Sequence, residues 1–342
     1  MTEKYTYTEL EEDLEKIINE TGIFHENVDN MFHYTTLKGM MGIIDSASMH
    51  LSRIDVLNDE KEVKYLHNEF SKALDYCIKQ VTLEKDGHFL NVFKDIVDNN
   101  KRELSTPTTP WGRNPVDSYL HSNEVYVCSF STKEDSLDMW KYYSKGDGVC
   151  IKFNIDKCAG YYDKIYEYRK AHDSIVAVRC NKYIGKVIYD ADQQVKLFEE
   201  ILMKGLETYK KFCGDDDNKV LDMFWGNEFY KRVIFPMALF MKDPSFSNEQ
   251  ESRIVITKKF TMSEKSDWDT LAFVGEYSNR YKLIDGMLRP YIEMAIPQDS
   301  ICKIHLSPTT KCDGKVVLEY LKSKGIKIEE SNIVKSKIPL RF

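Results

Sequence analysis

Hydrophobic residues recur three and four positions apart in several stretches of the chain, a spacing that predicts amphipathic helices. In the first stretch, Thr8 to Asn19, Thr8 is followed by Glu11 three residues later, the arrangement of a capping box. Further helices are predicted over Leu37–Asp45, Asp59–Val81, Ala191–Phe212, Asn227–Met241 and Lys315–Lys324.

Shorter runs rich in Val, Ile, Phe and Tyr predict strands, of which Val125–Ser131 and Val149–Asn154 are the clearest. Other strands are predicted over Ser174–Cys180, Lys186–Tyr189, Arg253–Thr257, Leu271–Val274 and Ile301–Ser307. Strands and helices follow one another irregularly. We therefore expect an α+β fold, with mixed, largely antiparallel sheets and flanking helices, and not a doubly wound sheet.

The charge of the chain limits its partners. With 48 Lys and Arg against 55 Asp and Glu, the net charge is −7, which argues against a protein that coats DNA but leaves room for a local basic groove. No apolar run reaches the roughly 18 residues of a membrane span, and the polar, acidic N-terminus does not have the pattern of a signal peptide. We expect a cytoplasmic protein that does not contact a membrane.

The cysteines and glycines exclude several common sites. None of the eight cysteines forms a C-x-x-C pair, and no two histidines have the i, i+4 spacing of a zinc motif. We therefore expect reduced, buried thiols and no metal. The sequence also contains no Gly-x-Gly-x-x-Gly after a strand and no Walker loop, so the standard dinucleotide and triphosphate folds are unsupported.

Two motifs combine hydroxyl and aromatic residues. His33 and Tyr34 lie on an extended segment before a short helix, so their side chains point to opposite faces, and one can face a cleft. The run Ser129-Phe130-Ser131 ends a predicted strand and is followed by Trp140 and Tyr143, three apart on one helix face. These two aromatic residues can stack on a nucleobase or nicotinamide ring, or they can hold the helix against the sheet.

A third motif combines carboxylates with a cation. Glu249 and Glu251 are two residues apart and lead into a strand, where alternation would put both carboxylates, and Arg253 with them, on one face. Like charges at that distance raise the pKa of one carboxyl group or require a cation, which Arg253 supplies. The motif is either a candidate site or an ordinary surface ion pair of small effect.

In this order the motifs resemble the bacterial domain-of-unknown-function family 2971. The resemblance rests on His33–Thr36, Leu57–Asp59 with Glu62, Ser129–Ser131 with Met139, Trp140 and Tyr143, Glu249–Arg253, Arg289–Ile292, Ile304, Pro308 and Lys335–Pro339. It covers roughly Met31 to the C-terminus. It therefore implies a helical N-terminal extension over residues 1–30 and a single α+β domain over residues 31–342.

A second resemblance is to the ADP-ribosyltransferase superfamily, and it rests on the order of a histidine on an early strand, a strand ending in serine and a Glu-x-Glu before a late strand. It implies an ADP-ribosyltransferase-like fold and NAD as co-substrate, without a metal. His33 would hold a ribose, and Glu251 would be the catalytic acid while Glu249 orients the acceptor. The implied NAD-binding residues are His33, Tyr34, Thr35, Ser129, Trp140, Tyr143 and Arg253.

Two other functions stay open. A non-catalytic module would use the same cleft to bind a nucleotide or a protein, as a sensor or effector in bacterial stress or phage defence, and would leave NAD intact. A nucleotide or sugar hydrolase would use Glu249, Glu251 and His33, and would turn over its substrate without releasing nicotinamide. The sequence does not identify the acceptor, which could be protein, nucleic acid, a small molecule or water.

Overall fold

In the computed structural model, contacts divide the chain into two compact units, each built from separate stretches of sequence. The first unit comprises Met1–Phe24, Asp59–His121 and Val187–Phe246, and the second His25–Asn58, Ser122–Lys186 and Ser247–Phe342. The structure describes residues 5–24, 31–57, 72–80, 89–91, 94, 123–144, 147–154, 157–158, 165–171, 174–213, 219–262, 280–284 and 286–339. The predicted boundary between an N-terminal extension, residues 1–30, and a domain over residues 31–342 stays a prediction.

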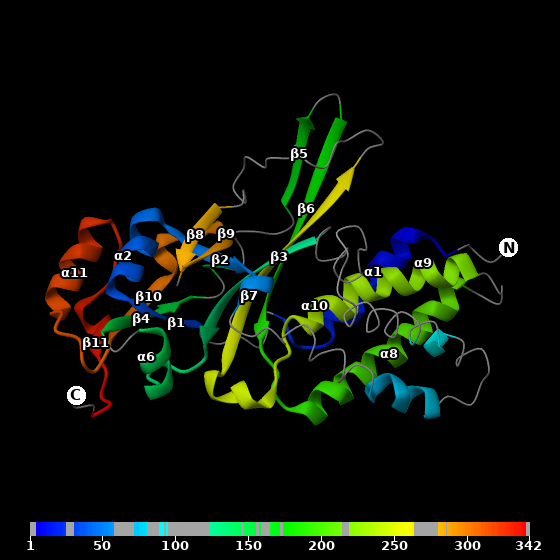
Figure 1. Ribbon diagram of the computed structural model, residues 1–342, viewed down its shortest axis with the longest axis horizontal. Coiled ribbons are helices and arrows are strands. Elements are labelled where there is room, and N and C mark those ends of the chain that lie inside the picture. Colours follow the sequence, from blue (N-terminus) through cyan, green and yellow to red (C-terminus); the bar gives the residue numbers. More distant parts are fainter. Residues whose placement is uncertain are drawn as a thin grey trace. The chain divides into compact units, whose positions relative to one another are not determined.

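The first unit is helical (Figure 1). Its helices are α1 (Tyr7–Asn19), α8 (Ala191–Cys213), α9 (Lys219–Phe229), the π-helix η2 (Tyr230–Ile234) and α10 (Phe235–Ala238). Residues 72–80 are also helical, the described part of the helix predicted over Asp59–Val81. The indole of Trp225 lies at the centre of an aromatic core, with its ring centroid 4.9 Å from that of Phe229 and 5.0 Å from that of Phe89.

The predicted capping box of α1 exists, but it lies two residues earlier. The N-cap is Thr6, whose side chain accepts a hydrogen bond from the Glu9 backbone, and the Glu9 carboxylate accepts one from the Thr6 backbone at 2.6 Å. Thr8 lies inside the first turn, so its prediction as the cap was wrong. Both Thr–Glu pairs have the same spacing, and only the Thr6–Glu9 pair lies where the helix begins.

A proline explains the π-helix. The predicted helix Asn227–Met241 overlaps a longer run, Lys219 to Ala238, in which α9, η2 and α10 follow one another without a break, and its last three residues lie beyond that run. Pro236 has no backbone N–H, so the usual hydrogen bond to the carbonyl four residues earlier is missing. The Phe235 N–H instead donates to the Tyr230 carbonyl, five residues earlier.

The second unit contains one large sheet, and an α+β fold is confirmed. Its strands are β1 (Met31–Thr36), β2 (Ser48–Arg53), β3 (Asn123–Ser131), β4 (Gly148–Phe153), β5 (Ile165–Ala171), β6 (Ser174–Lys186), β7 (Glu251–Met262), β8 (Arg280–Ile284), β9 (Met287–Ala295), β10 (Ile301–Leu306) and β11 (Ile333–Lys335). The main order is β11-β10-β4-β1-β3-β2-β9-β8, with β7 beside β3 and β6 between β7 and β5. Every pair except β10 with β11 is antiparallel.

The sheet splits beside β3. One edge of β3 pairs with β7 along its whole length, up to Ser131 opposite Glu251. The other edge pairs with β1 only at Ser131, and with β2 only at Val127 and Tyr126. Strands β1 and β2 therefore diverge next to Ser129, which leaves part of this edge of β3 without a strand neighbour among the described residues.

Helices cover the two faces of the sheet (Figure 1). Side chains of α2 (Leu37–Ser46) and α11 (Gly314–Ser323) join one face in the main core, which includes Met40, Ile44 and Leu321. The short helix α6 (Leu137–Tyr143) packs on the other face through Met139 and Trp140. We call these the α2–α11 face and the α6 face. The 3₁₀ helices η1 (Ile54–Val56), η3 (Pro244–Glu249), η5 (Gln298–Ser300) and η6 (Glu330–Asn332) connect elements.

The strand predictions were correct for β3, β4 and β10, and those over Ser174–Cys180 and Arg253–Thr257 cover only parts of β6 and β7. Strand β6 runs unbroken from Ser174 to Lys186, so the separate strand predicted over Lys186–Tyr189 was wrong. The sequence did not predict β2, β5, β8, β9 or β11, and Leu271–Val274 lies outside the described residues. Seven cysteines in the described ranges carry free thiols. Within those ranges no helix has both the length and the apolar character to cross a bilayer.

Candidate functional site

A buried ion pair opens strand β7. Arg253 Nε donates to Glu251 Oε1 at 2.5 Å, and Arg253 Nη2 donates to Glu251 Oε2 at 2.9 Å. Glu251 is 4% exposed and Arg253 1%. Alternation along the strand puts both side chains on one face, as predicted. Because Ser131 is opposite Glu251 and pairs with Phe32 on β1, this is the α6 face.

Glu249 does not lie on the strand, so the predicted alternation does not extend to it, although its carboxylate reaches the same α6 side. Glu249 ends the 3₁₀ helix η3, and Gln250, between the two glutamates, has φ 41°. Positive φ is uncommon for a residue with a side chain and often accompanies a functional site. The partly buried Glu249 carboxylate accepts a hydrogen bond from the Tyr143 hydroxyl at 3.0 Å.

The end of β3 holds this turn in place. The Ser131 hydroxyl donates to the Glu249 carbonyl at 2.9 Å, and the Thr132 backbone N–H donates to the Gln250 carbonyl at 2.8 Å. Thr132 Oγ1 donates to the same carbonyl at 3.1 Å. The unusual Gln250 backbone is thus fixed from both sides by residues distant in sequence.

The aromatic residues of α6 differ in what they can reach. Trp140 is 1% exposed and its ring lies 4.8 Å from that of the buried Tyr34, so neither ring is available to stack on a ligand. Of the two roles open to Trp140, the structure supports holding the helix against the sheet. Tyr143 is 41% exposed, and its hydroxyl faces Glu249. Partial loss of hydration is the largest cause that raises the pKa of the Tyr143 hydroxyl, and the negative charge of Glu249 is the next. The hydroxyl therefore stays protonated and can donate a hydrogen bond at neutral pH.

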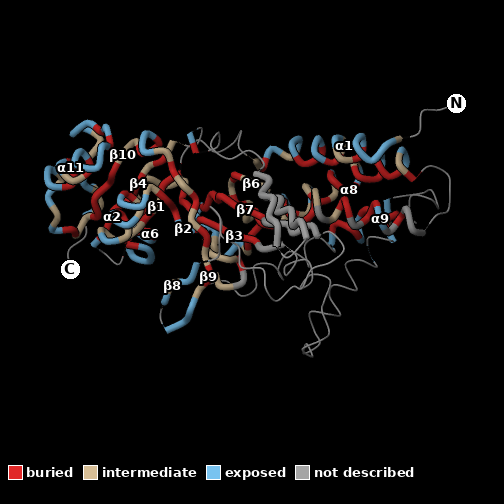
Figure 2. Tube along the Cα trace, turned by 90° about the horizontal axis from the view of Figure 1, so that it is seen from above, coloured by how far each residue is buried: buried red, intermediate tan, exposed pale blue. Residues whose placement is uncertain are grey.

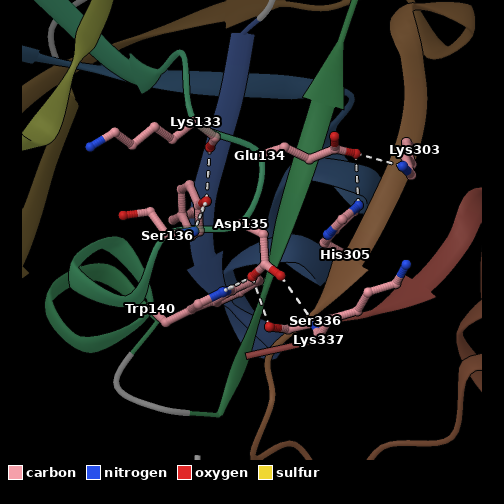
Figure 3. A network of polar contacts seen from close by, with 10 residues as sticks. Lys133, Glu134, Asp135, Ser136, Trp140, Lys303, His305, Ser336 and Lys337 are labelled. Carbon is pink, nitrogen blue, oxygen red and sulfur yellow. Dashed lines mark hydrogen bonds and ion pairs between the residues drawn. The ribbon is translucent and has the colours of Figure 1, made fainter. Parts of the chain in front are cut away.

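A polar network anchors the segment between β3 and α6 to the C-terminal part of the chain (Figure 3). Asp135 accepts hydrogen bonds from Trp140 Nε1 at 2.6 Å, from Ser336 Oγ at 2.7 Å and from the Lys337 backbone at 3.2 Å. Beside it, Glu134 contacts Lys303 Nζ at 2.5 Å and His305 Nε2 at 2.8 Å. The network fixes the start of α6, and hence the helix that carries Tyr143.

Replacement of Asp135 by alanine is expected to destabilise the protein by about 1–3 kcal/mol, because it leaves the buried Trp140 indole N–H without its acceptor. The matched control is Asp138→Ala, an exposed carboxylate in the first turn of α6, which should cost less than about 1 kcal/mol. Urea unfolding of both variants measures the difference. Equal costs would show that the Asp135 network does not anchor α6.

His33 lies apart from the carboxylates. Its neighbour Phe32 shares the α6 face with Ser131 and Glu251, so the alternation directs His33 to the α2–α11 face, where its ring contacts Phe130. Nδ1 lies 3.3 Å from the Ser129 carbonyl at the split in the sheet. Because a carbonyl only accepts, Nδ1 carries the proton. Burial, with a smaller effect from Lys282, lowers the pKa of His33 to about 4.

Thr35 has a packing role. A Cβ on Gly148 would lie 2.2 Å from the Thr35 carbonyl, so this neighbour must be glycine, and a Cβ on Gly39 would lie 2.1 Å from Thr35 Oγ1, which would have to move. The motif residues Asn58, Asp59 and Glu62 lie outside the described residues. The structure thus brings together Ser129, Tyr143, Glu249, Glu251 and Arg253 on the α6 side, and it separates His33 from them.

The sequence analysis missed a group of basic and aromatic residues on the hairpin β8–β9. Arg280, Lys282 and Arg289 lie on the same hairpin face as Tyr291, whose ring centroid is 4.2 Å from that of His50 on β2. Of these residues, only Arg289 and Tyr291 belonged to the motifs on which the family resemblance rests, and no role was predicted for either. Alternating charge along an unpredicted strand was the signal that could have revealed them. No cluster of metal-ligating side chains occurs in the described ranges.

Comparison with known proteins adds one finding. Residues 139–254 match the family described as "Protein of unknown function (DUF2971)". The matched segment runs from α6 to the first residues of β7, so it includes Tyr143, Glu249, Glu251 and Arg253 and excludes His33. No curated protein and no solved structure matches the chain. The resemblance to ADP-ribosyltransferases therefore has no support from these comparisons.

Proposed function

We propose that the chain is an enzyme acting on a nucleotide of the NAD class, and that it cleaves the nicotinamide–ribose bond beside the start of β7. The proposal rests on one arrangement. A partly buried carboxylate, Glu249, is bonded to the hydroxyl of the exposed Tyr143, while Glu251 next to it is held by Arg253.

The chemistry requires a carboxylate that a ligand can approach. When nicotinamide leaves, positive charge develops on the ribose, and a carboxylate nearby lowers the energy of that transition state. Both oxygens of Glu251 are bonded to Arg253 within the protein interior. Glu249 is the more accessible of the two, so we assign it the role that the resemblance gave to Glu251.

The surrounding residues would position the reacting groups. The exposed ring of Tyr143 offers a surface on which a planar ring can stack. Ser131 and Thr132 hold the backbone on either side of Gln250, which keeps Glu249 in one place and limits the reorganisation needed during reaction. The buried ion pair of Glu251 and Arg253 lies beside these residues at the start of β7. The acceptor of the ribosyl group is left open.

The test is incubation of the purified protein with NAD and a cell lysate, with mass spectrometry for free nicotinamide and ADP-ribose adducts. Wild type is expected to release nicotinamide and Glu249→Gln to release none, while its Tm stays within about 2 °C of wild type. The matched control is Glu319→Gln, an exposed carboxylate on α11, which should keep full activity. Release by Glu249→Gln at the wild-type rate would refute the assignment.

A non-catalytic binding module is the second candidate, and the neutralised Glu251–Arg253 pair favours it. Under this alternative NAD stays intact, and nucleotides at a fixed concentration raise the Tm, with a larger rise for those that bind more tightly. Loss of a nucleotide without nicotinamide release would instead indicate a hydrolase. Either result would refute the transfer chemistry.

A further inference from the structure

The hairpin β8–β9 carries a row of apolar residues that continues beyond the core. Alternate residues of β9 lie on the α2–α11 face, where Ile292 is fully buried in the main core and Leu288 is 69% exposed. Leu288 is directly opposite Leu283, which is 71% exposed, and Tyr281 on the same face is 63% exposed. Adjoining apolar side chains at the surface mark a contact with another molecule.

Strand β8 also ends the sheet on this side. It pairs with β9 along one edge, and no strand of the described ranges pairs with its other edge. Figure 2 shows most of β8 and the adjoining part of β9 as exposed, so another chain can approach this open edge. An open edge presents backbone N–H and C=O groups to which a further strand can bond.

A proline indicates which residues direct these groups outward. In an antiparallel pair of strands, positions that exchange two backbone hydrogen bonds alternate with positions that exchange none. Pro290 has no N–H, so it cannot form a full hydrogen-bonded pair with Tyr281 opposite. Tyr281, and Leu283 two residues later, therefore direct their N–H and C=O groups to the open edge. Because the same two residues have exposed apolar side chains, one partner can bind both their backbone and their side chains.

The other face of β8 limits the partner by its charge. Arg280 and Lys282 alternate along the strand with the apolar residues, and Arg280 also donates to Glu293 of β9 at 2.9 Å. A second copy of β8 would bring the same two cations beside these and would be repelled; lysine on an edge strand commonly prevents such pairing of like chains. A strand with acidic residues at alternate positions would instead be attracted.

We propose that the open edge of β8 binds an extended, acidic segment of a partner protein as an additional strand. Apolar residues of that segment would lie against Tyr281, Leu283 and Leu288, and its acidic residues would lie beside the cations of the opposite face. Hydrogen bonds to the backbone of β8 would supply affinity, and the alternation of side chains would supply specificity. The proposal does not depend on cleavage of NAD at Glu249.

The test is binding of a fluorescent six-residue peptide, in which valine alternates with glutamate, to the full chain, measured by anisotropy. Wild type is expected to bind it at least about tenfold more tightly than the same peptide with lysine in place of glutamate. Lys282→Glu should weaken binding of the acidic peptide and strengthen binding of the basic one. The matched control is Lys322→Glu, an exposed lysine on α11, which should behave as wild type does. No binding by wild type, or equal affinity for both peptides, would overturn the proposal.

A proline variant tests the backbone edge directly. Leu283→Pro removes the outward N–H and leaves the pairing with β9 intact, so it should weaken binding of the acidic peptide at least about tenfold while the Tm stays within about 2 °C of wild type. Leu283→Ala keeps the N–H and shortens the same side chain, so it should lose less affinity. Equal losses in the two variants would refute strand addition. A wild-type dimer that Leu283→Pro dissociates, measured by sedimentation, would identify a second copy as the occupant and overturn the acidic partner.

Discussion

Replacement of Arg253 by methionine is expected to lower the free energy of unfolding by about 3–5 kcal/mol. The substitution keeps a long side chain in the core but leaves the Glu251 carboxylate, 4% exposed, without the guanidinium that donates to both its oxygens. An isolated charge in the interior is costly because it loses its hydration and gains no partner. Urea unfolding at neutral pH measures the loss.

Two further variants separate the ion pair from general damage to the sheet. The double variant Glu251→Leu/Arg253→Met removes both charges and should recover most of the loss, since a buried pair is often replaceable by apolar residues. Asp299→Asn breaks the exposed pair between Lys157 and Asp299 and should cost far less stability than Arg253→Met, because solvent screens exposed charges. A double variant no more stable than Arg253→Met would show that packing, and not charge, accounts for the effect.

His33 is expected to make the protein sensitive to acid. Its pKa is about 4 in the folded chain, against an ordinary value of 6.5. As the pH falls below 6.5, the unfolded chain takes up a proton that the folded chain does not, so the stability contributed by neutral His33 is complete above that pH and is lost toward pH 4. At 1.36 kcal/mol per unit, the loss amounts to about 3 kcal/mol.

The matched variant is His33→Asn, whose side-chain amide can still donate to the Ser129 carbonyl but does not titrate. Between pH 7 and pH 4 its free energy of unfolding should fall by about 3 kcal/mol less than that of wild type. Burial also lowers the pKa of His50 and of His305, so both proteins keep some acid sensitivity. Parallel curves for the two proteins would contradict the depressed pKa.

Local patterns predicted part of the candidate site. The shared face of Glu251 and Arg253 follows from the two-residue period of a strand, and the opposite directions of His33 and Tyr34 follow from the same rule. Whether His33 or Tyr34 points toward the carboxylates depends on how β1, β3 and β7 are aligned. In the observed register Phe32 pairs with Ser131, and Ser131 pairs with Glu251. The sequence alone contains no signal for that register.

Other features depend on contacts between distant residues. Glu249 was predicted on the strand because nothing in the sequence indicates that Gln250 adopts a positive φ, which Ser131 and Thr132 stabilise from another strand. Strand β9 was missed because Pro290 interrupts the apolar run, and proline argues against a central strand. Pro290 is tolerated because the pairing of β9 with β2 begins only at the following residue, Tyr291, so that Pro290 has no partner on β2.

The interleaved composition of the two units affects how the chain can fold during synthesis. The buried side of α1, including Leu10 and Leu14, belongs to a unit whose helices α8, α9 and α10 begin only at Ala191. Likewise, β1 is made early, whereas its sheet is completed only when β7 to β11 leave the ribosome. Neither unit can complete its core before much of the chain is made, so fragments ending near residue 120 should need chaperones to stay soluble.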